Sequence, residues 1–417
     1  MSFRNLIFSV LGCLLLVGPS ALFCAQNVVK ADLPSNVTAE DASYLTGGIV
    51  EVDVRASASI AGFASGEFQS AMEDEVGNYI PFKADALLGN AALQRLAIGS
   101  SNRLFSWPCY PTYFGSTKLY SPEHNALFEM PMLNESRIMQ RRALEDDLES
   151  FGKGLALVAS QFPEKRFIVI MADRSSTSSV NPANPLVTET MMTSECVQVL
   201  YDEVAGVENV SVDAREYDDI AEYLGRYYPT DHHWNGYGAI DAFYETQGRD
   251  FEESGALGDG KQGSVSFAPL VFNGTLSRRG LLCLNRSVTE PEFDTSDLEV
   301  DEAAAQYFSA LLSEDGPTLV NQQGLRAEYN FYSLWYGGDR ACEIHNEAIE
   351  TGSALLISDS YGDAFRWILA ERYHRVIGKM DLKKAKYSVE ELSEVVKASD
   401  CGDVYIVGWA GGFHALT

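Results

Sequence analysis

The sequence predicts an α/β protein whose core is a parallel β-sheet with helices on both faces. Short apolar runs alternate with longer segments whose apolar residues recur at three- and four-residue intervals. The first pattern is typical of strands buried inside a parallel sheet, and the second is typical of helices that pack against one. One apolar run leads directly into a Ser-Asp-Ser sequence, as expected of an α/β sheet that carries its site at the carboxyl ends of its strands.

The predicted elements follow one another in a regular order from residue 136 onward. Helices are expected at about 138–158, 187–204, 363–373 and 389–397, and strands at 166–171, 210–212, 354–357 and 403–409. Because strands and helices alternate, the strands should be joined by right-handed crossovers into one parallel sheet. Apolar residues between 66 and 97 also recur at helical spacing.

Two other segments interrupt this pattern. Residues 27–65 are small and polar, and they are predicted to be a linker. Residues 250–340 are rich in Gly, Asp, Glu and Ser, and they are predicted to be an insertion or a separate lobe. The main domain is therefore expected to span residues 66–417, with an insertion at 250–340.

The first 26 residues predict export. Arg4 is the only charge, and the stretch from Leu6 to Ala25 is nearly all apolar. A charged start followed by such a stretch is typical of an export signal. It is also about long enough to cross a bilayer as an uncleaved anchor, although Gly18 and Pro19 interrupt it. We expect the protein outside the cell or on its surface, and cleavage and anchoring both stay open.

Charge and cysteine content exclude some classes of protein. A net charge of −28 argues against nucleic-acid binding, which needs basic surface. Five cysteines follow residue 26, so they cannot all pair, and their spacing does not suggest zinc. Cys283 and Cys342 are plausible partners in a disulfide, but buried thiols are the preferred interpretation. We expect no metal and no cofactor.

The sequence YYPTDHHWNGYGA at 227–239 places two histidines, an aspartate and a tryptophan before a predicted helix. Asp231 and His233 are two residues apart, so an irregular turn would let the carboxylate accept the imidazole Nδ1–H. That bond would fix the tautomer and stabilise the imidazolium formed when the ring takes a proton. The alternative is that the two histidine rings only form hydrogen bonds with nearby backbone groups and that Trp234 is part of the core.

A second group of residues follows the predicted strand 354–357. Ser358, Asp359 and Ser360 lead from that strand into a helix. Such a position displays a serine above the sheet edge, and the helix N-terminus offers N–H groups to a developing oxyanion. The serine could instead only cap the helix. Together with Asp231 and His233, Ser360 would complete the nucleophile, base and orienting group that acyl transfer needs.

These motifs resemble those of the bacterial DHHW proteins, relatives of the SGNH-hydrolase-like domain of the alginate O-acetylation proteins. The likeness covers most of residues 66–410 in the family's order. It rests on YYPTDHHWNGYGA, LLISDSYGDAF, YHRVIGKMDLKKAKYS, the Tyr336-Gly337-Gly338 stretch and FQSAMEDEVGNYIPFKADALL. The resemblance implies an SGNH-hydrolase-like (flavodoxin-like) parallel sheet.

The resemblance also implies roles for single residues. Asp231 would orient the base, His233 would be the base, and Ser360 would be the nucleophile, with His232 at the variable middle position. The order Asp, His, Ser is permuted relative to ordinary SGNH esterases. Ser358 stands where those enzymes usually have Gly, which puts their oxyanion-hole detail in doubt here.

The activity implied is acyl transfer, most simply of an O-acetyl group, to a polysaccharide or another cell-envelope glycan, or hydrolysis of such an ester. A membrane acyltransferase could supply the acyl donor. Backbone N–H groups of Ser360 and Tyr361 could hold the oxyanion, with Gly337 and Gly338 as further donors. Four aromatic residues could form a sugar platform or belong to the core: Tyr228, Trp234, Trp335 and Tyr361.

Two rival interpretations remain. The letters Asp-His-His also occur in the DHH phosphoesterases, where they bind manganese together with further aspartates. Here the early strand offers only Asp173, followed by Arg174. The stronger rival is a non-catalytic surface protein that binds a glycan or a partner. The triad hypothesis predicts Ser360 within about 2.6–3.2 Å of His233. It also predicts that His232 points elsewhere, because successive side chains in an extended loop diverge.

Overall fold

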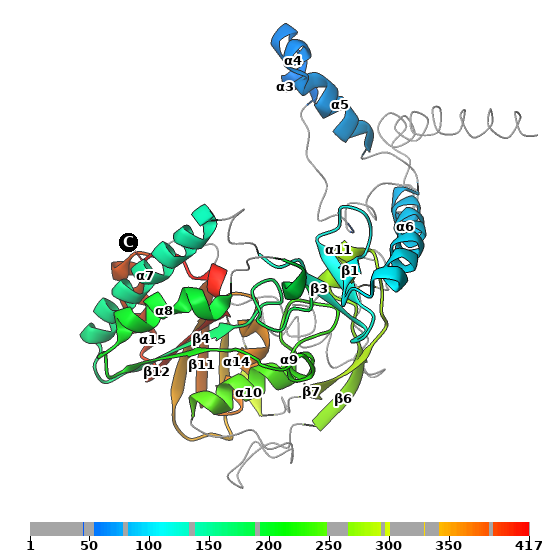
Figure 1. Cartoon of the computed structure of the whole chain (residues 1–417). Coiled ribbons are helices and arrows are strands. Elements are labelled where there is room, and N and C mark those ends of the chain that lie inside the picture. Colours follow the sequence, from blue (N-terminus) through cyan, green and yellow to red (C-terminus); the bar gives the residue numbers. More distant parts are fainter. Residues whose placement is uncertain are drawn as a thin grey trace, which may run out of the picture. The chain divides into compact units, whose positions relative to one another are not determined.

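The computed structural model describes most of the chain, in two compact units. The described residues are 54–77, 82–132, 138–187, 192–247, 266–292, 297–300, 342–382 and 387–416, with Leu45 and Tyr329. Unit 1 comprises residues 1–116, 277–283 and 321–329, and unit 2 comprises residues 117–276, 284–320 and 330–417. Each unit is treated by itself below (Figure 1). No described helix is both long enough and apolar enough to cross a membrane.

Unit 2 is built around a seven-stranded sheet with the order β5-β4-β12-β10-β11-β9-β8. The five strands from β5 to β11 are parallel, and β9 and β8 add an antiparallel edge. The bounds are β4 Arg166–Ala172, β5 Val210–Ala214, β8 Leu298–Val300, β9 Glu343–Asn346, β10 Ser353–Ser358, β11 Arg375–Asp381 and β12 Asp403–Trp409. The predicted α/β class with a parallel sheet is confirmed.

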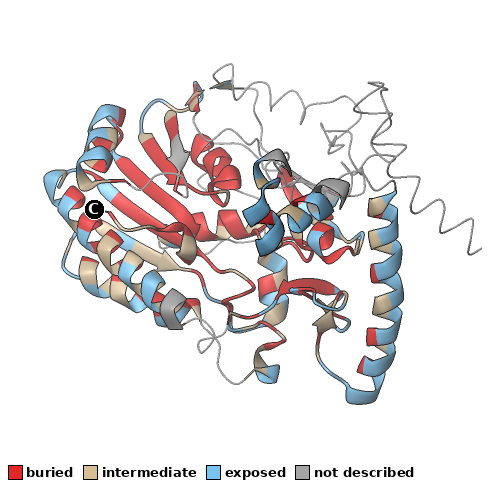
Figure 2. Cartoon of the chain, turned by 90° about the horizontal axis from the view of Figure 1, so that it is seen from above, coloured by how far each residue is buried: buried red, intermediate tan, exposed pale blue. Residues whose placement is uncertain are grey.

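Helices cover both faces of this sheet. On one face, α7, α8 and α15 pack against apolar side chains of β4, β10 and β12. On the other face, Phe243 of α10 and Phe365 of α14 contact Tyr405, which alternates with Val404 and Ile406 along β12. The bounds are α7 Ile138–Gln161, α8 Thr193–Val204, α9 Ile220–Arg226, α10 Gly236–Thr246, α14 Gly362–Ala370 and α15 Val389–Ser399. Figure 2 shows the buried strands between exposed helix surfaces.

Two hairpins accompany the sheet. Strands β2 (Lys118–Ser121) and β3 (Ala126–Glu129) pair antiparallel, as do β6 (Ser266–Val271) and β7 (Ser287–Glu292). The second hairpin, α11 (Thr275–Gly280) and β8 are the described elements of the segment 250–340 that was predicted to be an insertion. Strand β8 extends the main sheet.

Unit 1 contains the helices that follow the N-terminal region. They are α3 Val54–Ser57, α4 Ile60–Ser65, α5 Glu67–Gly77 and α6 Lys83–Phe105, followed by the short strand β1 Tyr110–Pro111. The end of the predicted linker 27–65 thus contains two short helices. The predicted export segment, residues 1–26, lies outside the described residues. The boundary between the units, after residue 116, falls within the domain predicted at 66–417.

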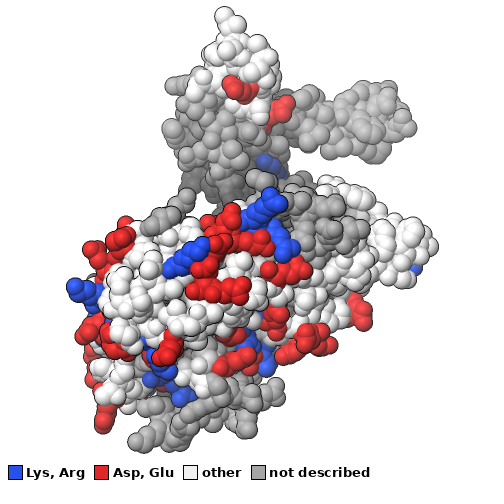
Figure 3. All heavy atoms as spheres, turned by 60° about the vertical axis from the view of Figure 1, so that its left-hand side comes forward, with Lys and Arg blue, Asp and Glu red and all other residues white. Residues whose placement is uncertain are grey.

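The cysteines and the surface charge agree with a large domain rich in acidic residues. The five cysteines after residue 26 are thiols, so Cys283 and Cys342 do not form a disulfide. Four of the five are buried, because α/β cores accept small thiols as apolar side chains. On the face shown in Figure 3, acidic side chains are spread among basic ones.

Candidate active site

Ser360 lies directly beyond the carboxyl end of β10, in a tight turn that leads into α14. The Asp359 N–H donates to Val407 O of the neighbouring strand (3.1 Å), and the Gly362 N–H donates to Asp359 O (3.0 Å). A Cβ at Gly362 would lie 2.3 Å from the Cβ of Ser358, so the turn requires glycine there. The local sequence therefore fixes where the serine is displayed.

The Asp-His-His-Trp sequence forms an irregular loop between α9 and α10. Its two ends are joined by a β-bridge between Tyr227 and Trp234. Asn235 caps α10 by accepting from the Gly238 N–H (3.0 Å). The buried Trp234 indole donates its Nε1–H to Tyr361 O (3.0 Å), which ties this loop to the serine turn.

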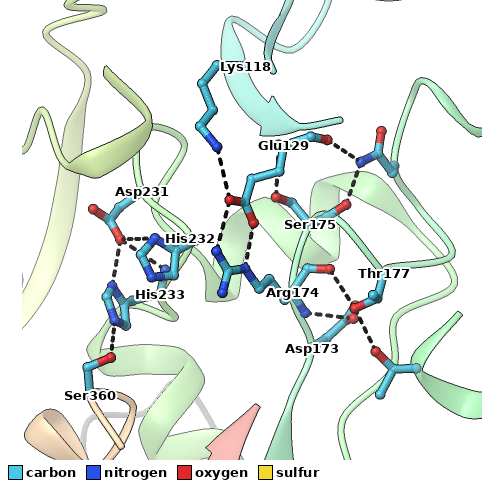
Figure 4. A network of polar contacts seen from close by, with 12 residues as sticks. Lys118, Glu129, Asp173, Arg174, Ser175, Thr177, Asp231, His232, His233 and Ser360 are labelled. Carbon is cyan, nitrogen blue, oxygen red and sulfur yellow. Dashed lines mark hydrogen bonds and ion pairs between the residues drawn. The ribbon is translucent and has the colours of Figure 1, made fainter. Parts of the chain in front are cut away.

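The loop and the turn bring Asp231, His233 and Ser360 into one line (Figure 4). His233 Nδ1 lies 2.6 Å from Asp231 Oδ1, and His233 Nε2 lies 2.7 Å from Ser360 Oγ. The separation expected between Ser360 and His233 is therefore present. Asp231 and His233 are buried, at 2% and 6% exposure, whereas Ser360 is only partly buried.

Asp231 is held from its other side by the start of α11. The Thr275 N–H donates to Asp231 Oδ2, and the Leu276 N–H donates to Thr230 O (3.1 Å). Burial alone would raise the pKa of Asp231, but the two histidines and the hydrogen bonds from His233 and Thr275 hold it well below its usual value. Asp231 is thus a carboxylate that orients the His233 ring.

Sequence reasoning missed this supporting loop. Gly274 approaches Asp231 so closely that a Cβ there would lie 2.1 Å from Asp231 Oδ2. Both Gly274 and Thr275 belong to the segment predicted to be an insertion. Their N-G-T sequence indicates a turn, and nothing in it indicates contact with a carboxylate 44 residues earlier in the chain.

His232 is not where the sequence analysis placed it. The residues from 229 to 233 form bends and turns rather than an extended strand, so neighbouring side chains need not diverge. The His232 ring lies 4.0 Å from that of His233, centroid to centroid, and its Nδ1 is 3.4 Å from Asp231 Oδ1. Burial and the neighbouring His233 lower the pKa of His232, so this ring is neutral.

A buried ion-pair network lies beside His232 (Figure 4). Arg174 forms a bidentate pair with Glu129, at 2.5 and 2.9 Å, and Lys118 Nζ lies 3.1 Å from the same carboxylate. Burial opposes ionisation of Glu129, but its pairing with Arg174 keeps the pKa of this carboxyl well below its usual value. Arg174 also stacks over the Trp409 ring at 4.6 Å. These residues join the ends of β3, β4 and β12.

Three aromatic residues that the sequence analysis assigned to substrate or oxyanion contacts are buried in the core. Tyr228, Trp234 and Tyr361 are at most 1% exposed, so they belong to the core and offer no sugar platform. The Tyr361 N–H already donates to Asp359 Oδ1 (2.9 Å). Among the described residues, no acceptor bonds the Ser360 N–H, which leaves it for an oxyanion. Gly337, Gly338 and Trp335 lie outside the described residues.

The same cluster also has ligand atoms for a metal. One atom each from Asp231, His232 and His233 lie within 4.8 Å of one another. However, His233 uses its two ring nitrogens for Asp231 and Ser360, and the positive charge of Arg174 acts on His232. A second cation beside that guanidinium is disfavoured. The donor set therefore fits a serine triad better than a metal centre.

The likeness of this chain to known proteins is one of fold. No family model matches the chain, and no curated protein matches it in sequence. Bacillus cereus PatB1, in a structure with a sulfonyl adduct, is similar over 72% of this chain and 96% of that chain, with 12% identity and a TM-score of 0.50. The fold is SGNH-like.

Two further solved structures are similar with lower TM-scores. A DHHW family protein from Eubacterium siraeum is 15% identical over 72% of this chain and 96% of that chain, with a TM-score of 0.48. The O-acetyltransferase domain of Pseudomonas putida AlgJ is 12% identical over 72% of this chain and 91% of that chain, with a TM-score of 0.33.

Proposed function

We propose that this protein is an exported SGNH-like acyltransferase or esterase that uses Asp231, His233 and Ser360 as its catalytic triad. The observation that carries the proposal is the continuous line from Asp231 Oδ1 through both His233 nitrogens to Ser360 Oγ. These residues come from a loop and a turn that are 127 positions apart in the sequence. Nothing local requires them to meet, so their alignment favours a shared chemical role.

The hydrogen bonds of Asp231, His233 and Ser360 indicate which atom carries each proton. Because Asp231 is ionised, it accepts from His233 Nδ1–H, and Nε2 is left with its lone pair toward Ser360. Ser360 Oγ–H then donates to Nε2. On attack at an acyl carbonyl, Oγ forms the new C–O bond while His233 takes the hydroxyl proton. The tetrahedral intermediate carries an oxyanion, which the free Ser360 N–H is placed to stabilise.

This intermediate collapses when His233 gives the proton to the departing alcohol, and an acyl-serine remains. In the second half, a hydroxyl of the acceptor gives its proton to His233 and attacks the ester carbon. The second tetrahedral intermediate then collapses: the bond to Ser360 Oγ breaks, and Oγ takes the proton back from His233. Transfer and hydrolysis differ only in whether this hydroxyl belongs to a sugar or to water.

The acyl group is most simply acetyl, and the acceptor is a polysaccharide or another cell-envelope glycan. This part of the proposal follows from the motif resemblance to DHHW and alginate O-acetylation proteins. Location outside the cell follows from the apolar segment Leu6–Ala25. A donor supplied by a membrane acyltransferase would suit a protein placed there.

The proposal is tested by turnover of a small acetyl ester by purified protein. Ser360→Ala and His233→Ala should each lower kcat by about 10⁴-fold or more, because the triad acts as a unit. Ser160→Ala, at an exposed position on α7, is the matched control and should keep full activity. Adding candidate glycans and following acetylated product by mass spectrometry separates transfer from hydrolysis. Equal turnover in all three variants would favour the non-catalytic binding protein instead.

A further inference from the structure

Helix α6 of unit 1 buries few side chains and exposes several large apolar ones. Its buried residues are Ala84, Ala91, Ile98 and Asn102. Leu93, Leu96 and Leu104 are 69%, 69% and 81% exposed, and their spacing places them together on the opposite face. A surface helix normally has the reverse distribution. Figure 2 shows this long helix buried along one side only.

The exposed apolar surface continues past the end of the helix. Phe105 and Trp107 are 62% and 44% exposed, and their rings stack with centroids 5.2 Å apart. The Trp107 N–H is fixed by a bond to Asn102 Oδ1 (3.0 Å), so this pair is an ordered extension of α6. We call Leu93, Leu96, Leu104, Phe105 and Trp107 the α6 surface. Five large apolar side chains exposed along one helix and its end indicate an interaction site.

The α6 surface also differs in charge from the rest of the chain. Residues 82–116 contain three basic residues, Lys83, Arg95 and Arg103, and one acidic residue, Asp85. The whole chain has a net charge of −28. Arg95 is directed into unit 1, where it donates to the carbonyls of Thr112 and Leu281. Apart from Asp85, the segment therefore lacks acidic residues that would repel an anionic lipid surface.

We propose that the α6 surface docks on a lipid bilayer. Leucines with a Phe-Trp pair at the end of a helix are suited to the interface, where Trp rests at headgroup level. The apolar segment Leu6–Ala25 precedes helix α3 of unit 1 in the chain. The 28 residues between Ala25 and Val54 span at most about 100 Å when extended. An uncleaved anchor would therefore hold the helices of unit 1 within reach of the membrane.

The test places an environment-sensitive fluorescent amino acid in the full chain at position 100, in place of Ser100. That residue is exposed on the same face of α6, between Leu96 and Leu104. Vesicles of phosphatidylcholine and phosphatidylglycerol should shift the emission to the blue, and brominated lipid should quench it. The same probe at position 160 on α7, also exposed, should show neither effect. This second probe distinguishes docking of α6 from simple tethering by the N-terminal segment.

Charged substitutions complete the test. Leu96→Glu with Leu104→Glu should abolish the shift at position 100, whereas Leu157→Glu, at a leucine 59% exposed on α7, should leave it unchanged. A blue-shifted emission without vesicles that grows with protein concentration would indicate a second copy as the occupant and overturn the proposal. A shift without vesicles that is independent of concentration would mean that the chain covers its own α6 surface. An unshifted spectrum with vesicles would exclude lipid contact.

Turnover of a soluble acetyl ester should be unchanged in the Leu96→Glu and Leu104→Glu variant, because these residues belong to unit 1 and the triad to unit 2. Failure of lipid docking and failure of the proposed catalysis are therefore separate results. Unchanged thermal melting of the variant checks that α6 still folds.

Discussion

Ser360 and Asp231 are positioned in two different ways. The serine depends on neighbours in sequence: β10, the Asp359 turn and Gly362 hold it within a few residues. Asp231 depends on distant ones, because Gly274 and Thr275 close over its carboxylate from a hairpin. The proposed nucleophile is thus fixed by a strand-to-helix turn, whereas the carboxylate that orients the His233 ring needs long-range packing. The two regions should therefore respond differently to substitution.

The largest effect should come from the charge of Asp231. Asp231→Asn keeps the shape of the side chain but favours the wrong His233 tautomer, with its proton directed at Ser360. We expect kcat on a small acetyl ester to fall by about 10³- to 10⁴-fold, with little change in KM. Asp202→Asn, exposed on α8, is the control. Near-normal turnover of Asp231→Asn would show that this carboxylate does not orient the base.

The next effect should come from the supporting loop. Gly274→Ala would force a Cβ to within 2.1 Å of Asp231 Oδ2, so the loop must move away and the carboxylate loses its alignment. Because misplacement of about 1 Å can cost 10²-fold, we expect kcat to fall by about that factor. Gly225→Ala, where a Cβ meets nothing within 4 Å, should retain activity. If the two variants were equally active, the loop between β6 and α11 would have no part in holding the triad.

A third effect concerns how the stability contributed by two buried carboxyl groups, Asp173 and Asp231, depends on pH. Burial raises the pKa of Asp173, at the end of β4, from 3.8 to about 7, whereas partners lower that of Asp231. The stability associated with neutral Asp173 is present below about pH 4 and is lost as the pH rises toward 7. The stability that ionised Asp231 contributes is lost only as the pH falls below the ordinary pKa of an aspartate.

Asp173→Asn should therefore stabilise the protein at pH 8 by as much as about 4 kcal/mol and have little effect at pH 4. Asn can still accept the Arg174 N–H that now bonds Asp173 Oδ1 at 2.9 Å. Urea unfolding of both proteins across this pH range measures the difference. A stabilisation independent of pH would mean that Asp173 does not titrate in this window.

The smallest effect should come from His232. Its ring lies beside Asp231, but no hydrogen bond joins it to Ser360 or to either ring nitrogen of His233. His232→Gln keeps the backbone carbonyl that accepts from Tyr361 Oη (2.6 Å). We expect kcat to change by less than about 10-fold, which is under 1.4 kcal/mol in barrier height. A loss as large as that of His233→Ala would make His232 part of the catalytic unit.

Much of the sheet could be predicted because its strands are short, apolar and separated by amphipathic helices. Strand β12 and the start of α7 at Ile138 match the expected ranges. The antiparallel strands β8 and β9 were missed, since short edge strands lack a continuous apolar run. The helix expected from residue 187 begins at Thr193, because Pro185 belongs to a separate short 3₁₀ turn.

In the site, too, residues within local sequence motifs could be predicted, whereas residues that depend on distant packing could not. Ser360, His233 and Asp231 could be proposed from two motifs, because reactive side chains follow a strand or occupy a loop before a helix. Thr275 and Gly274 could not, since their role depends on how a distant hairpin folds back. The burial of Trp234 and Tyr361 was also not predictable, because an aromatic residue beside a motif suits a core and a platform equally well.

The central claim is that Ser360 is a nucleophile activated by His233. Sulfonyl fluorides attach covalently to activated nucleophiles, and the similar PatB1 structure carries a sulfonyl adduct. Mass spectrometry of the intact protein and its peptides after treatment with a sulfonyl fluoride tests the claim most directly. The account predicts one adduct, on Ser360, whose rate of formation falls sharply in His233→Ala and Asp231→Asn. An unmodified Ser360, or one modified at the same rate in all three proteins, would contradict it.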